Sequence, residues 1–160
     1  MSEGIFAASA VVAAVGSGVV AGVFFAFSTS VMRTLAGLPA AQGIAAMQRI
    51  NVVIVKGWFL AVFLGTAALS AVLAVLALVL RPENGLVVAV LGAALYLVGG
   101  FGVTVAANVP RNDRLAALDA EDPGSEAPWR EFVAEWTVWN HVRGAACAAA
   151  CACFAAAPLG

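Results

Sequence analysis

Three long stretches without a charged residue constrain the fold of this chain more than any other feature. They are Ile5–Phe27, Gly57–Leu80 and Leu86–Ala107. A helix needs roughly 20 apolar residues to cross the hydrocarbon core of a bilayer, and each stretch has that length. A fourth apolar segment near the end is shorter, but aromatic residues lead into it. We therefore expect one transmembrane domain, residues 1–160, with helices at about 5–27, 57–80, 86–107 and 132–159.

The composition supports the same class. The chain is 63% hydrophobic and 11% charged, with a mean hydropathy of +1.00, whereas soluble domains are about 45–50% apolar and about 25% charged. We predict an all-α fold, a four-helix transmembrane bundle whose main partner is the lipid bilayer. Small residues such as Gly18 and Gly22 favour close helix packing and leave a homo-oligomer open. The amino terminus lacks a positive signal region, so the first helix is expected to be retained, and no basic stripe indicates nucleic acid.

The basic residues predict how the bundle is oriented. Seven of the eight lie in or beside the first and third connections, at positions 33, 49, 56, 111, 114, 130 and 143, and one lies in the second, at Arg81. The positive-inside rule places the first and third connections in the cytoplasm and both termini outside. We expect the functional loops on that one membrane face.

The connections differ in their predicted structure. Arg81–Gly85 predicts a tight turn, and Ile44–Asn51 predicts a helical extension of the second membrane helix. Asn108-Val-Pro110 predicts that the third helix ends in a turn, because proline cannot donate a backbone hydrogen bond. Helix is expected to resume near Pro128.

The last predicted helix carries the densest cluster of chemically useful side chains. Trp136, Asn140 and Arg143 lie at i, i+4 and i+7 and share one face, whereas His141 is rotated by about 100° from Asn140. One interpretation is an aromatic interfacial belt with a snorkelling arginine. The other is a pocket in which Trp136 and Trp139 flank a flat aromatic ligand, while Arg143 and Asn140 donate hydrogen bonds to its oxygens.

His141 is the expected general base in the second interpretation. It is the only histidine, and histidine alone has an ordinary pKa of roughly 6.5, near working pH. Asp113 and Glu135 are substitutes if burial raises the pKa of one of these carboxyls.

Other polar residues are predicted to gather on the same membrane face and to line a polar cup. They are Gln48, Asn51, Asn108, Arg111 and Asn112. Cys147 and Cys151 lie one helical turn apart without a second pair of ligands nearby, so they are expected to pack as small apolar residues, and no metal site is predicted.

Four motifs in order resemble the anthrone oxygenase-like family of small membrane proteins. They are Phe24-Phe25-Ala-Phe-Ser28 followed by Val31-Met32, Met47-Gln48-Arg-Ile-Asn51, Asn108-Val-Pro-Arg-Asn-Asp113 and Trp136-x-x-Trp139-Asn140-His141-x-Arg143. The resemblance covers most of the chain. It implies an oxidoreductase of the bacterial cytoplasmic membrane, related to oxygenases of polyketide pathways, that oxidises an apolar anthrone or polycyclic phenol with O₂ and needs no flavin, haem or other cofactor.

The resemblance also implies roles for the residues. His141 would be the base, Arg143, Asn112 and Asn140 would stabilise the oxyanion, and Trp136 and Trp139 would stack on the substrate. Ser28, Gln48, Asn51, Asn108 and Arg111 would complete the substrate site. Two alternatives remain open from the residues. One is a non-enzymatic membrane module that binds a lipid or quinone or packs in a larger complex, and the other is a metal-dependent oxidase that uses His141 with carboxylates or with a symmetry-related copy of the chain.

Overall fold

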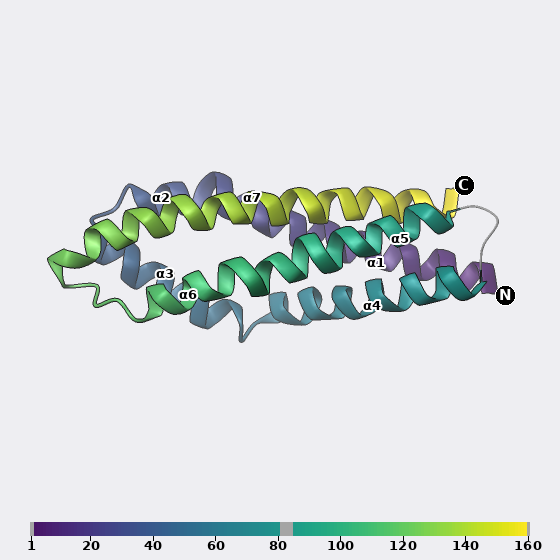
Figure 1. Ribbon diagram of the computed structural model, residues 1–160, viewed down its shortest axis with the longest axis horizontal. Coiled ribbons are helices and arrows are strands. Elements are labelled where there is room, and N and C mark those ends of the chain that lie inside the picture. The colour runs from purple at the N-terminus through teal and green to yellow at the C-terminus, as the bar shows by residue number, and fades with distance from the viewer. Residues whose placement is uncertain (1, 81–84, 160) are drawn as a thin grey trace.

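The chain folds into long helices that run side by side (Figure 1). The computed structural model describes residues 2–80 and 85–159 and is all-α within those ranges. Four helical segments are long and apolar enough to cross a membrane, namely Gly4–Ala36, Trp58–Val79, Leu86–Ala116 and Pro123–Leu159. The predicted all-α fold is therefore confirmed, and the chain is an integral membrane protein.

The elements follow one another with few breaks. Helix α1 (Ser2–Ala26) continues through the π-helical segment η1 (Phe27–Val31) into α2 (Met32–Ala36), and α3 (Ala40–Ile54) and α4 (Trp58–Leu80) follow. Helix α5 (Leu86–Ala94) continues through the π-helical segments η2 (Leu95–Gly102) and η3 (Thr104–Asn108) into α6 (Val109–Ala116). A 3₁₀ turn, η4 (Pro123–Ser125), leads into α7 (Glu126–Ala156), and η5 (Ala157–Leu159) ends the described chain.

Helix α7 is the element around which the others pack. It contacts α1 and α5, and α4 contacts the same two helices from the opposite side. The helices approach closely at small residues: a Cβ added at Gly99 would lie 2.5 Å from the Cβ of Ala146. In Figure 1 both termini lie at one end of the molecule, and α2, α3, α6 and the start of α7 gather at the other. We call this second end the cap.

Two apolar cores stabilise the structure. The core between the long helices includes Phe63, Tyr96 and Phe154. The core of the cap includes Met47 and Trp136 and joins α2, α3, α6 and α7. Two cores in one continuous set of helices leave a junction between them, and the candidate site lies there.

The π-helical segments explain two differences from the predicted helix ends. The first helix does not end at Phe27 but continues to Ala36, and the third does not stop at Asn108 but continues to Ala116. Pro110 is the second residue of α6 and follows directly after η3, so the helix runs through the proline without a break. The predicted turn at Asn108–Pro110 is therefore wrong.

The cap differs from the prediction at α3. Residues 44–51 do not extend the second membrane helix, because the chain turns at Val55–Gly57 before α4 begins. This turn lets α3 pack on α6 and α7 and bury Ile44 and Met47 in the cap core. The last helix begins at Glu126, ahead of the predicted position 132. Of the predicted turn Arg81–Gly85, residues 81–84 lie outside the described residues, and Gly85 has φ +82, a conformation that suits glycine.

Candidate active site

An apolar pocket lies at the junction of the two cores. Its cavity volume is about 160 Å³, which is smaller than the roughly 300–1,000 Å³ of common ligand pockets, and it opens to the outside of the molecule. Most of its lining is aromatic or aliphatic. The lining residues are Val23, Phe24, Phe27, Ile50, Asn51, Ile54, Val55, Phe59, Leu60, Phe63, Thr104, Val109, Asn112, Trp136 and Arg143. We call it the Arg143 pocket.

Arg143 brings the one positive charge into this lining. Helix α7 holds it at the junction, and the residue is only 5% exposed. Its guanidinium carbon lies 4.2 Å from the centre of the Phe24 ring and 5.2 Å from that of Trp136. These distances are in the range of cation–π attraction, which strengthens when the cation is desolvated. The two rings therefore fix the guanidinium in a dry, apolar setting.

The hydrogen bonds of Arg143 go to neutral groups. Nη1 donates to Thr104 Oγ1 at 3.2 Å, and Nη2 donates to Asn140 Oδ1 at 2.6 Å. Nε is buried and has no hydrogen-bond partner among the described residues. In the part of the chain that the structure describes, the arginines in salt bridges are Arg111 and Arg130, and no carboxylate contacts Arg143. A buried cation without a counter-ion is costly, so this site favours an anion.

Asn140 holds Arg143 in place. The residue is fully buried, and its Nδ2 donates to the Phe24 carbonyl at 2.7 Å and to Ser28 Oγ at 2.6 Å. Both hydrogens of the Asn140 amide are thus donated to acceptors in α1 and η1, and the amide oxygen faces the guanidinium of Arg143. The predicted residues Ser28, Asn140 and Arg143 form one hydrogen-bonded chain from α1 to the pocket.

Trp136 and Asn112 form a second pair at the pocket. Trp136 Nε1 donates to Asn112 Oδ1 at 2.8 Å. This bond fixes the amide, because the oxygen must face the indole and the two hydrogens of Nδ2 must point elsewhere. No acceptor for Nδ2 is found among the described residues, and Asn112 lines the pocket. Asn112 is therefore oriented as a second donor, and Asn51 of α3 adds another amide to the lining.

Two residues important for the pocket had no predicted role. Thr104 accepts from Arg143, and Phe24 stacks on it. Thr104 is the first residue of η3, and Phe24 lies shortly before η1; π-helical segments are frequent at functional sites. Phe24 belongs to the motif Phe24–Ser28 that carries the family resemblance, whereas nothing in the local sequence marks Thr104.

His141 lies away from this pocket. The side chain is exposed and lines a separate groove between α1 and α7, beside Gly22, Phe25 and Gly144. Asn140 separates the two cavities, because it lines the groove on one side and holds Arg143 on the other. The structure therefore does not bring His141 together with Arg143, and helix geometry gives the reason: the two residues are only two positions apart and point to nearly opposite faces.

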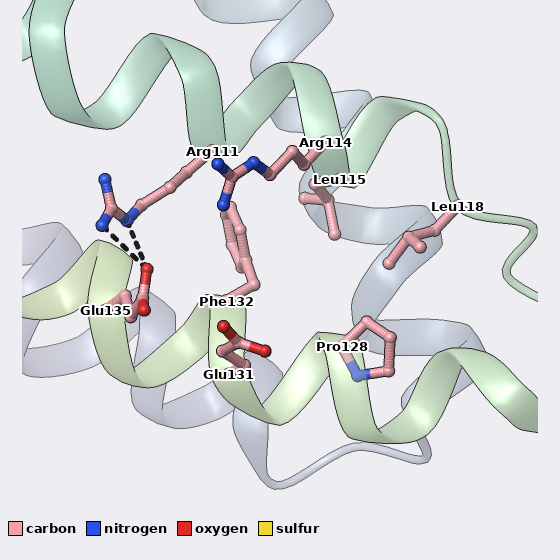
Figure 2. Close-up of a pocket in the computed structure, with 8 residues that line it drawn as sticks. All are labelled: Arg111, Arg114, Leu115, Leu118, Pro128, Glu131, Phe132 and Glu135. Carbon is pink, nitrogen blue, oxygen red and sulfur yellow. Dashed lines mark hydrogen bonds and ion pairs between the residues drawn. The ribbon is translucent and has the colours of Figure 1, made fainter.

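Arg111 and Trp139 also lie outside the pocket. Arg111 Nε and Nη2 each lie 2.8 Å from Glu135 Oε2, and Nη1 donates to the Ala107 carbonyl. Figure 2 shows this ion pair at a second pocket between α6 and α7, which is also lined by Arg114, Glu131 and apolar residues. The Trp139 ring is 37% exposed and lies 5.8 Å from the Arg111 guanidinium. Trp136 lines the Arg143 pocket and Trp139 does not, so the prediction that the two tryptophans flank one ligand is wrong.

The remaining predicted residues have structural contacts. Gln48 Nε2 donates to the Leu115 and Leu118 carbonyls at 2.9 and 3.0 Å, which ties α3 to the end of α6. Asn108 is buried, and its Nδ2 lies 3.4 Å from the Trp136 carbonyl.

The cysteines and acids of the described residues form no cluster. Cys147 is buried against Gly100, where an added Cβ would lie 2.8 Å from its sulfur. Within residues 2–80 and 85–159, no group of three His, Cys, Asp or Glu side chains gathers.

Comparison with known proteins supports the family that the motifs resemble. No curated protein and no solved structure matches the chain. The sequence model of the family described as Anthrone oxygenase matches residues 58–153. The matched region is more than half of the chain and contains Thr104, Asn112, Trp136, Asn140 and Arg143. This chain belongs to the anthrone oxygenase family.

Proposed function

We propose that this protein is a membrane oxygenase that converts an anthrone or a similar apolar polycyclic phenol to a quinone with O₂. The observation that carries the proposal is Arg143, a buried guanidinium without a carboxylate partner in the described chain, facing an aromatic pocket. Phe24, Phe59, Phe63 and Trp136 line the pocket and offer apolar contact to a flat aromatic ring system, and an oxyanion on that ring system would supply the missing counter-ion.

The reaction needs no electron donor besides the substrate. An anthrone loses one proton from its activated methylene and becomes an aromatic enolate. The enolate carbon then transfers one electron to O₂, and the resulting radical pair combines to a peroxide anion, which takes up a proton. Loss of water from this hydroperoxide leaves the new carbonyl, so that methylene and O₂ give carbonyl and water. We propose that no cofactor takes part.

The roles of the residues follow from where charge develops. Arg143 stabilises the enolate oxygen, and Asn112 Nδ2 donates a second hydrogen bond. Preoriented donors of this kind are usually the largest catalytic contribution, with roughly 10²–10³ in rate for one donor. Asn140 and Trp136 act as positioning residues, because each fixes one donor through a bond of 2.6–2.8 Å. The aromatic walls exclude water from the radical pair.

The distribution of basic residues supports one orientation of the protein in the membrane. The cap and its flanks carry Arg33, Arg49, Lys56, Arg111, Arg114 and Arg130. We propose that the cap faces the cytoplasm of a bacterial cell and that both termini face outward. The rim of the pocket includes the exposed apolar residues Val55 and Val109, which suits a substrate that partitions into the membrane.

The test is oxygen uptake and quinone formation by the purified protein in detergent with a simple anthrone. A protein-free control gives the background, because anthrones oxidise slowly unaided. We expect turnover above background, a fall of roughly 10²–10³-fold in Arg143→Met, and no change in Arg130→Met, which removes an exposed charge of the same helix. Turnover equal to background would refute the oxygenase. Binding without turnover would identify a ligand-binding module instead.

A further inference from the structure

The Arg143 pocket lacks a side chain that can take a proton from its substrate. The polar groups of its lining are Asn51, Thr104, Asn112, Trp136 and Arg143. Amides, a hydroxyl, an indole and a guanidinium do not accept protons near neutral pH. The other residues of the lining are aliphatic or phenylalanine. A general base therefore would have to reach the substrate from outside the lining.

The titratable groups around Arg143 do not meet this need. Helix α1 and segment η1 present Phe24 and Ser28 to this part of the site, and α4 presents Phe59 and Phe63. On α7 the neighbour is the Cys147 thiol, one helical turn away, which is packed against Gly100.

The charged residues near the site are engaged or turned away. Glu135 is held by Arg111 on the side of α6 and α7 that Figure 2 shows, away from the pocket lining. Asp113 is exposed and His141 lines the separate groove. None of these three residues lines the pocket.

From this arrangement we infer that the protein takes its substrate as a preformed anion, so that Arg143 selects the ionised form and no side chain acts as the base. The inference rests on the proposed function for the identity of the reaction, but the binding preference stands by itself. A neutral ligand leaves the guanidinium without a counter-ion, whereas an anion compensates it. The substrate class is thereby narrowed to phenols and anthrones acidic enough to lose their proton to water or at the membrane surface.

If the substrate must be ionised before it binds, the direction in which kcat/KM changes with pH is fixed. Because only the ionised substrate binds to Arg143, the fraction of ionised substrate sets the rate at low substrate concentration. The ratio kcat/KM should be low below the pKa of the substrate, rise through that pKa and become constant above it. Two substrates of different acidity should give midpoints that differ by the difference in their own pKa values.

The first experiment measures binding and needs no turnover. The probes are anthracene-9-carboxylate, which is anionic, and anthracene-9-carboxamide, which has the same ring system and no charge. We expect the wild-type protein to bind the carboxylate roughly 10- to 100-fold more tightly, the range for a hydrogen bond to a charged group. Arg143→Met should remove this preference, and Arg130→Met should keep it. Equal affinities of the wild-type protein for the two probes would overturn the inference, whatever the variants do.

The second experiment compares kcat/KM against pH for two anthrones of different acidity, with wild-type protein and His141→Gln. Midpoints that follow each substrate and persist in His141→Gln support the inference. A midpoint common to both substrates and lost in His141→Gln would assign the base to the protein and overturn it. If no turnover occurs, the proposed oxygenase fails, and the probe affinities still decide whether the pocket selects anions.

Discussion

Replacing Asn140 by aspartate gives Arg143 a counter-ion, which the described part of the chain does not supply, with almost no change of shape. Asn140 Oδ1 already accepts from Arg143 Nη2 at 2.6 Å, so a carboxylate oxygen at that position forms an ion pair. A bound ligand anion would then meet a neutral pair instead of a single positive charge. With roughly 7 Å between the new carboxylate and the ligand and an effective dielectric of about 20, the repulsion is about 2.4 kcal/mol. This lowers the affinity for an anion by roughly 50-fold.

The fold should tolerate this change. Aspartate loses the donor to the Phe24 carbonyl, a bond of 2.7 Å, at a cost of about 1–3 kcal/mol. The Ser28 hydroxyl can turn and donate to the new carboxylate, and the ion pair with Arg143 offsets part of the cost. Thermal unfolding in detergent measures this stability, and equilibrium binding measures the affinity for anthracene-9-carboxylate. The neutral carboxamide is the internal control, since its affinity should not change. Asn140→Asp protein that binds the carboxylate as tightly as wild type would refute the view that an uncompensated Arg143 creates the site.

Three further substitutions test one contact at the site and two contacts that stabilise the fold. Trp136→Phe keeps an aromatic ring but removes the hydrogen bond of 2.8 Å to Asn112, so kcat/KM should fall by roughly 3- to 10-fold with normal protein yield. An unchanged kcat/KM would show that the reaction does not depend on the orientation that Trp136 gives to the Asn112 amide. Gln48→Leu removes two bonds that tie α3 to α6, and the free energy of unfolding should fall by about 1–3 kcal/mol in chemical denaturation; wild-type stability would contradict this role. Gly99→Ala should lower the unfolding temperature, because the added Cβ meets a neighbouring Cβ at 2.5 Å, whereas Gly65→Ala has open space and should not. Equal temperatures for these two variants would contradict the close helix contact.

Much of the fold could be predicted because the bilayer limits what an apolar chain can form. Uncharged stretches of about 20 residues predict membrane helices by length alone, and four candidate spans are present. The predicted break at Pro110 was wrong because the helix continues through η3 into α6. Side chains of this same helix donate to its carbonyls, Thr104 Oγ1 to Gly100 and Arg111 Nη1 to Ala107, each four positions back, and hydropathy does not reveal such bonds.

The candidate site was predictable where one helix carries it. Helical spacing places Trp136, Asn140 and Arg143 on one face. In the structure Trp136 and Arg143 line one pocket, and Asn140 holds Arg143 by a hydrogen bond. The same spacing rotates His141 away, although its chemistry made it the expected base. Contacts between helices decide the rest: Phe24 reaches Arg143 from 119 positions earlier in the chain, and Thr104 reaches it from 39 positions earlier. Long-range pairs of this kind need the packed structure.

The central claim is that Arg143 holds the oxyanion of an aromatic ligand in the pocket between the two cores. The most direct measurement is an experimental structure of the protein with anthracene-9-carboxylate bound. We expect the ring system in the pocket, in contact with lining residues such as Phe24, Phe63 and Trp136, with a carboxylate oxygen within hydrogen-bond distance of the Arg143 guanidinium. A ligand bound in the groove beside His141, with the Arg143 pocket empty, would contradict it.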